Sequence, residues 1–299
     1  MSRLARSIGG AVVLGVAASV GIGTGPLWAA GAEPHIEKLS WSFAGPFGGY
    51  DQAQLQRGFK VFSEACAFCH SLQYVPIRAL GSAQGPGFSE AAVAQIASQY
   101  MITDGPDAAG DMFERPGRPS DYFPAPFANE AAAKAANSGA YPPDLSLIAK
   151  ARAAHSGFPW FVLDALAQYQ EAGPDYVYAL LNGYEEPPAC AEGAGNNYNA
   201  AFLGGSLPAE CNDADGLSQY PGGFIAMPPP ISDGQVEYTD GSPETVEQYA
   251  KDVAAFLMWA AEPKLEERKS IGFRVMLFLI VFAVLLYLTK RKIWRNIAH

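Results

Sequence analysis

Positive charge is scarce in this sequence. Its 299 residues include 20 lysine and arginine residues against 30 aspartate and glutamate residues, which gives a formal net charge of −10 at pH 7. No run of three basic residues occurs before residue 290. Because surfaces that bind nucleic acid need clustered cations to neutralise phosphate groups, the sequence excludes nucleic acid as a partner.

Long regular elements are also few. The chain has 23 prolines and 31 glycines, and four of the prolines fall between residues 113 and 127, which excludes a regular helix or a central strand there. Capping residues and apolar periodicity predict helices at 51–65, 129–137, 144–152, 175–182 and 243–261. The fold class expected from these patterns is mostly α, with long loops.

Histidine and cysteine number only four each, yet three of these eight residues stand together. Cys66, Cys69 and His70 form a Cys-x-x-Cys-His motif. In this motif two thiols bond to the vinyl groups of a haem, and the histidine binds the iron as an axial ligand. The motif occurs once, so we expect one covalently bound haem c in a class I c-type cytochrome domain enlarged by insertions.

The second axial ligand decides the chemistry, because a closed iron suits electron transfer and an open one suits ligand binding or catalysis. Met227 stands in the segment GGFIAMPPP, where three prolines restrict the backbone and hold a thioether at a fixed reach. The position of Met227 in this segment favours it as the second axial ligand. The alternatives that the residues leave open are His155, Met101, Met112 and Met258.

The N-terminus has the pattern of an export signal. Arg3 and Arg6 precede a weakly apolar run over 8–22, and Ala30-Gly31-Ala32 supplies small residues for cleavage. We therefore expect residues 1–32 to be a signal peptide and the mature chain to begin at Glu33. A retained membrane anchor is the alternative, but the run is short and rich in glycine.

The C-terminus carries a second apolar run, from 271 to 289, interrupted only by Arg274. As a helix it would span about 28 Å, close to the hydrocarbon thickness of a bilayer. Cations at Lys290, Arg291, Lys292 and Arg295 follow, which indicates a cytoplasmic tail at 290–299. We expect a single membrane anchor at 270–289 in a bacterial inner membrane and a periplasmic domain at 33–269. A buried core helix is the alternative.

The predicted periplasmic domain is strongly acidic. It contains all 30 acidic residues but only 13 of the 20 basic ones, a net charge of −17, which favours a basic redox partner. The remaining cysteines, Cys190 and Cys211, lie in a loop-like segment of this exported domain. A disulfide between them would stabilise the domain by about 3 kcal/mol. Two free thiols are the alternative.

Six unusual blocks of sequence carry a resemblance that covers the chain from Trp41 to the tail. In order they are CAFCHSLQYVPIRAL, FERPGRPSDYFPAPF, AANSGAYPPDLSLIAKAR, NGYEEPP, GGFIAMPPPI and WAAEPKLEERKSIGF. Together they resemble the bacterial cytochrome c1 family of the ubiquinol–cytochrome c reductase (bc1) complex.

The resemblance implies roles for single residues. It makes Met227 the sixth ligand of the iron, opposite His70, and it pairs Arg152 with a haem propionate. Tyr74, Pro142 and Pro143 would line the haem crevice. The alternative for Arg152 is an ordinary surface arginine, and the alternative for the tyrosine and the two prolines is core packing. The Cys190–Cys211 pair resembles an extra disulfide of some bacterial members.

The resemblance also implies a function. The chain would be a redox subunit without a catalytic site of its own, and its partners would be cytochrome b, the Rieske iron–sulfur protein, a soluble cytochrome c and inner-membrane lipid. Electrons would pass from the Rieske protein to the haem and then to the soluble cytochrome c. The alternatives are a stand-alone membrane-tethered cytochrome and a haem enzyme with an open distal site.

Overall fold

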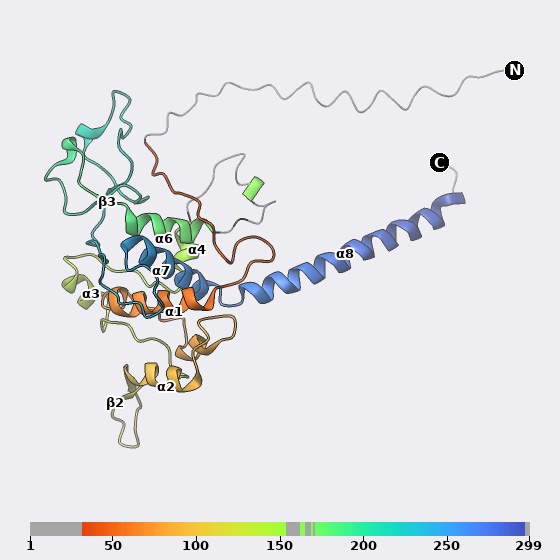
Figure 1. Cartoon of the computed structure of the whole chain (residues 1–299), viewed down its shortest axis with the longest axis horizontal. Coiled ribbons are helices and arrows are strands. Elements are labelled where there is room, and N and C mark those ends of the chain that lie inside the picture. Colours follow the sequence, from red (N-terminus) through yellow and green to blue (C-terminus); the bar gives the residue numbers. More distant parts are fainter. Residues whose placement is uncertain (1–31, 154–161, 165–168, 170, 297–299) are drawn as a thin grey trace.

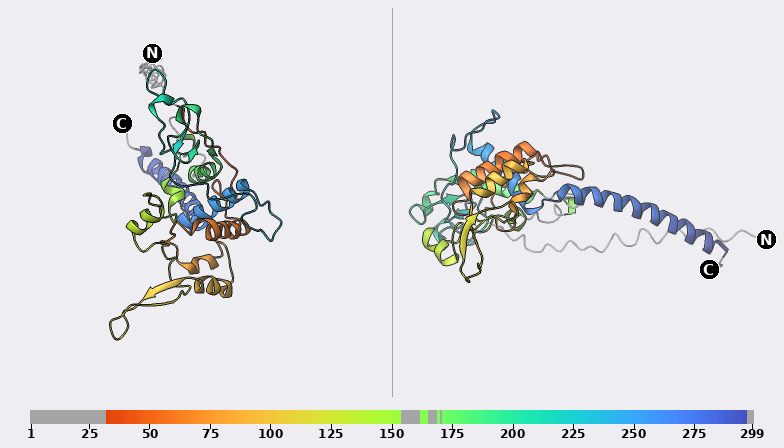
Figure 2. Two further views of the ribbon diagram at one scale, coloured as in Figure 1. Left: turned by 90° about the vertical axis from the view of Figure 1, so that its left-hand side faces the viewer. Right: turned by 90° about the horizontal axis from the view of Figure 1, so that it is seen from below.

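The computed structural model describes residues 32–153, 162–164, 169 and 171–296. A head of helices and long loops is followed by one helix, α8 (Leu265–Ile293), that projects away from it (Figures 1 and 2). The prediction of a mostly helical, loop-rich fold with one long C-terminal helix is confirmed. The predicted signal peptide, apart from residue 32, lies outside the described residues, as does His155.

Helices α1 (Gln52–Val61) and α7 (Val246–Ala261) cross at the centre of the head. Gly58 permits the crossing, because a Cβ at this position would lie 2.1 Å from the carbonyl oxygen of Asp252. Arg57 and Asp252 form an ion pair of 2.8 Å beside it. Asp252 is fully buried, so Arg57 provides the opposite charge that its carboxylate needs in the core.

Helix α7 is buried on more than the one stripe that its periodicity predicts. It packs against α1, α4 (Ile148–Ala151) and α6 (Ala172–Asn182). The helix begins three residues later than expected, because the side chain of Thr245 accepts a hydrogen bond from the Gln248 amide. Pro263 follows its end, as predicted.

Two shorter helices complete the head. Helix α2 (Glu90–Ser98), capped by Ser89, was not expected from the sequence, and α3 (Glu130–Ala136) is capped by Asn129 where the sequence predicts it. The expected helix over 144–152 is shorter, since only α4 forms there. Its predicted cap, Asp144, accepts hydrogen bonds from loop groups instead.

Strands are short and lie at the edges of the head. Strands β1 (Met101–Asp104) and β2 (Phe113–Pro116) form an antiparallel hairpin, with Met101 opposite Pro116. Strands β3 (Tyr184–Glu185), β4 (Tyr198–Asn199) and β5 (Gly223–Phe224) form a small antiparallel sheet in that order. The second sheet lies just before the proline-rich segment that carries Met227.

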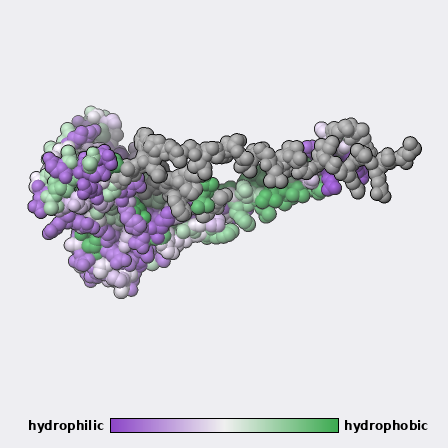
Figure 3. Space-filling view, turned by 90° about the horizontal axis from the view of Figure 1, so that it is seen from above, coloured by the Kyte–Doolittle hydropathy of each residue, from purple (hydrophilic) through white to green (hydrophobic). Residues whose placement is uncertain are grey.

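Helix α8 is long and apolar enough to cross a membrane. It has 29 residues, its most apolar window has a mean hydropathy of 2.6, and none of that window is buried inside the chain. Figure 3 shows the green, hydrophobic surface of this helix beyond the largely hydrophilic head. The expected anchor at 270–289 lies within α8.

Candidate haem site

The Cys-x-x-Cys-His motif follows α1 directly. The chain widens into a π-helical turn over Phe62–Cys66, and the amides of Cys69 and His70 then both donate to the carbonyl oxygen of Cys66, at 3.1 and 2.9 Å. Cys66 is half-buried, Cys69 is exposed, and both are free thiols. The turn therefore presents two unpaired sulfurs and an imidazole within five residues, as covalent haem attachment requires.

The ring of His70 is oriented by a backbone group. Its Nδ1 atom lies 2.8 Å from the carbonyl oxygen of Pro143. Because a carbonyl can only accept, Nδ1 carries the hydrogen, and the lone pair of Nε2 is left for a metal. Burial lowers the pKa of His70 and outweighs the opposing effects of the Pro143 carbonyl and the Asp144 charge. The imidazole is thus neutral, which is the form that binds iron.

Asp144 fixes the segment that carries Pro143. Its carboxylate accepts hydrogen bonds from the Ser71 hydroxyl at 2.7 Å, the Gln73 amide at 2.9 Å and the Ser146 amide at 2.9 Å. The Ser146 hydroxyl in turn accepts from the amide of Tyr74, at 3.1 Å. The loop after the motif and the loop of Pro143 are therefore held together. Sequence reasoning missed this role, although the Pro-Pro-Asp triplet marked the place.

Large apolar side chains near the motif are exposed to an unusual degree. Tyr74 is 64% exposed and Tyr141 is 51% exposed, and Tyr141 lines a cavity of about 200 Å³ together with Cys69 and Pro142. Phe68, within the motif, is 71% exposed. Core packing does not explain side chains that face outward. Their apolar surface beside two thiols and an imidazole fits a porphyrin ring, which would cover it.

The backbone around Met227 is held from one side by a tyrosine. The Tyr184 hydroxyl donates to the carbonyl oxygen of Met227, at 3.1 Å, and the Met227 side chain is half-buried. Just upstream, Gly222 has a φ of +74°, and a Cβ there would lie 2.1 Å from the carbonyl oxygen of Asn199. Only glycine fits that position, so the path of the chain into the methionine segment is fixed.

The three other candidate methionines are placed differently. Met258 is fully buried in α7, where it packs in the core. Met101 and Met112 are 55% and 60% exposed on the hairpin of β1 and β2. None of the three stands on a proline-rich segment, so their surroundings favour Met227 as the candidate ligand. That role of Met227 stays a prediction.

Arg152 is available for an anionic group. It caps the C-terminal end of α4, is exposed, and forms no ion pair with any residue of the described parts of the chain. Its charge acts on buried Tyr176 of α6, whose pKa is raised by burial and lowered in part by Arg152. Helix α4, which Arg152 ends, packs on α6, and Tyr184 follows α6 along the chain. A propionate would complete its charge balance.

Cys190 and Cys211 form a disulfide, with their Cα atoms 5.3 Å apart. They belong to two 3-10 turns, Ala189–Ala191 and Ala209–Cys211, on either side of β4. The bond therefore closes the insertion between Tyr184 and Gly222. The disulfide is far from the Cys-x-x-Cys-His motif in sequence. Its position would allow it to stabilise the segment that leads to Met227.

Comparisons with known proteins agree with this set of features. Residues 41–297 match the family model described as the Cytochrome C1 family. The chain is 47% identical over 291 residues to cytochrome c1 of Blastochloris viridis and 44% identical over 292 residues to cytochrome c1 of Cereibacter sphaeroides, and each alignment covers at least 94% of both chains.

A further relative is longer. The chain is 57% identical over 258 residues to cytochrome b/c1 of Bradyrhizobium diazoefficiens. That alignment covers 86% of this chain but spans only 35% of the relative.

Proposed function

Because the chain belongs to the cytochrome c1 family, whose members are haem c subunits of the bc1 complex, we propose that it carries single electrons outside the membrane. It would accept each electron from a Rieske iron–sulfur protein and donate it to a soluble cytochrome c. The quinol-oxidising site would belong to cytochrome b, so the enzyme is the assembled complex. The observation that carries the proposal is the hydrogen bond from His70 to Pro143, beside two free thiols.

Each candidate residue has a part in this proposal. Cys66 and Cys69 would hold the porphyrin as thioethers, and His70 and Met227 would bind the iron from opposite faces. The haem supplies a one-electron couple when bound, and thioether ligation favours a high potential. Arg152 would offset a propionate charge. Tyr74, Pro142 and Pro143 would keep water from the porphyrin edge, and Cys190 and Cys211 would brace the methionine segment.

The membrane arrangement follows from α8. We infer a signal peptide at 1–32, a periplasmic domain at 33–269, an anchor at 270–289 and a cytoplasmic tail at 290–299, in a bacterial inner membrane. The support is the length and exposure of α8, together with the cations Lys290, Arg291 and Lys292 in its last turn. This orientation puts the acidic head where a soluble cytochrome c can reach it.

The experiment is extraction of the chain from its membrane in mild detergent, followed by addition of quinol and a basic soluble cytochrome c. We expect copurification with cytochrome b and an iron–sulfur protein, and a rate of cytochrome c reduction that falls as salt screens the acidic head. A stable monomer without cytochrome b would instead support a stand-alone tethered cytochrome. Readily bound carbon monoxide in the native protein would support an open haem enzyme.

A further inference from the structure

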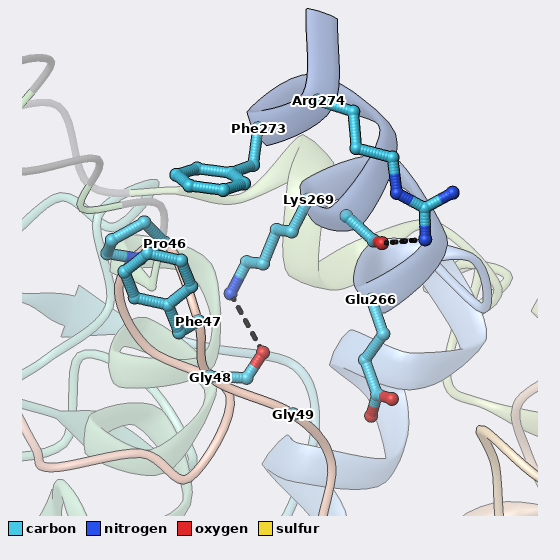
Figure 4. A pocket seen from close by; sticks show the side chains of 9 residues that line it. Pro46, Phe47, Gly48, Gly49, Glu266, Lys269, Phe273 and Arg274 are labelled. Atoms are coloured by element: carbon cyan, nitrogen blue, oxygen red, sulfur yellow. Dashed lines mark hydrogen bonds between the residues drawn. The ribbon is translucent and has the colours of Figure 1, made fainter. Parts of the chain in front are cut away.

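A cavity of about 280 Å³ lies where the head meets α8, away from the haem motif (Figure 4). One wall is the turn over 46–49 and the other is the first part of α8. Phe47, Glu266, Ser270 and Arg274 are among its lining residues. Ser270 and Arg274 begin the proposed anchor, but the electron-transfer role uses none of these residues.

One side of the cavity is aromatic. Phe47 is 79% exposed and Phe273 is 56% exposed, and their ring centroids are 5.6 Å apart in an edge-to-face arrangement. Phe273 stands at the start of the apolar run that begins at residue 271. Two exposed phenylalanine rings at this level fit the boundary between headgroups and acyl chains of a bilayer.

The other side is charged. The Arg274 guanidinium donates to the Ser270 hydroxyl at 3.1 Å, and this is its one hydrogen bond to a residue of the described chain. The Lys269 ammonium donates to the carbonyl oxygens of Phe43 and Gly48, at 2.5 and 3.3 Å. Two cations therefore face the cavity at the edge of a head that is otherwise strongly acidic. This local excess of positive charge favours a phosphate group.

A carboxylate lines the same cavity. Oε1 of Glu266 accepts a hydrogen bond from the Tyr50 amide, at 2.8 Å, which leaves the second oxygen for another donor. Residues 266, 270 and 274 recur every four positions and share one face of α8. Arg274 reaches back to Ser270, which stands one helical turn from Glu266, about 6 Å along the axis. A cation and a carboxylate on one helix face suit a headgroup that carries both a phosphate and an amine.

We propose that this cavity binds one phospholipid of the outer leaflet, of the phosphatidylethanolamine class. Arg274 and Ser270 hold the phosphate, Glu266 accepts from the ammonium group, and the acyl chains follow Phe273 and the apolar surface of α8. The inference rests on the membrane orientation proposed above but not on the electron-transfer role.

The test is lipid binding to the purified, delipidated complex, with native mass spectrometry as the readout. Phosphatidylethanolamine and phosphatidylglycerol are titrated separately against the wild type, Arg274→Gln, Arg274→Lys, Glu266→Gln and the control Arg291→Gln. We expect one phosphatidylethanolamine bound to the wild type and to Arg291→Gln, about tenfold weaker binding to Arg274→Gln, and recovery in Arg274→Lys. Glu266→Gln should abolish the preference for the ethanolamine headgroup.

Three results would overturn the proposal. They are no retained lipid on the wild type, an equal loss in Arg274→Gln and Arg291→Gln, or no difference between the two headgroups in the wild type. The haem absorption spectrum of each variant is recorded alongside, since none of the substituted residues touches the haem motif. An unchanged spectrum with lost lipid separates failure of this site from failure of the electron carrier.

Discussion

The hydroxyl of Tyr184 donates a hydrogen bond of 3.1 Å to the backbone carbonyl of Met227. Tyr184 follows α6 directly, and α6 packs on α7, so this bond ties the methionine segment to the core of the head. On the upstream side, the Ile225 amide donates to the Asn197 carbonyl at 2.9 Å. Both hydrogen bonds hold the backbone, and neither uses the thioether of Met227.

Replacement of Tyr184 by Phe tests this tie. Loss of this partly buried hydrogen bond should weaken the attachment of the segment by about 1 kcal/mol, which shifts the balance between bound and released thioether about fivefold. We expect the sulfur-to-iron absorption band to disappear at a lower temperature than in the wild type. Tyr220→Phe, whose hydroxyl has no hydrogen bond to a described residue, is the control. Identical melting of the band in both variants would contradict the role of Tyr184.

Replacement of Asp144 by Ala tests the support of the His70 ring. The substitution leaves the Ser71 hydroxyl and two backbone amides without their acceptor, so we expect a loss of about 2 kcal/mol in the free energy of unfolding. Denaturant unfolding measures this loss. Asp213→Ala is the matched control, because Asp213 accepts from two loop amides in the insertion, away from His70. The haem absorption spectrum is recorded for both variants. An equal change of this spectrum in Asp213→Ala would show that Asp144 has no special role in supporting His70.

The buried carboxyl of Asp175 predicts a pH dependence. It accepts from the Trp41 indole at 2.7 Å and from the Leu39 amide at 3.1 Å, but burial outweighs these bonds and raises its pKa to about 6. Between pH 4 and pH 6, Asp175 therefore keeps its proton in the folded head but has lost it in the unfolded chain. The free energy of unfolding should therefore fall as pH rises from 4 to 6, by about 2 kcal/mol from this group after screening.

Asp175→Asn removes that titration. We expect a flatter curve of melting temperature against pH between 4 and 6 in the variant, measured by circular dichroism of the full chain. Asp51→Asn, at the exposed cap of α1, is the control and should keep the slope. A slope that Asp175→Asn leaves intact would show that another group binds the proton.

The Cys190–Cys211 bond predicts a dependence on reductant. Replacing both cysteines by Ala should lower the free energy of unfolding by about 3 kcal/mol, because the open insertion has more freedom in the unfolded chain. Denaturant unfolding of the wild type with and without reductant gives the same comparison without mutation. Equal midpoints under both conditions would mean that the bond contributes nothing.

The sequence predicts local structure well and remote contacts poorly. The caps of α1 and α3 and the helix over the apolar run of α8 each depend on residues within a few positions of one another, and the structure confirms them. Haem attachment at Cys66 and Cys69 stays a prediction. Asp144 was mistaken for a helix cap, because its true partners Ser71 and Gln73 lie 73 and 71 positions away. The tie from Tyr184 to Met227 spans 43 positions and left no periodic signal.

Identity of the second ligand is the central claim, and absorption spectroscopy of the purified complex tests it most directly. The oxidised wild type should show a weak charge-transfer band near the red end of the visible spectrum, and the reduced wild type should not bind carbon monoxide. Met227→Leu should retain covalent haem, lose the band and bind carbon monoxide. A wild type without the band, or a Met227→Leu variant that keeps it, would contradict ligation of the iron by this sulfur.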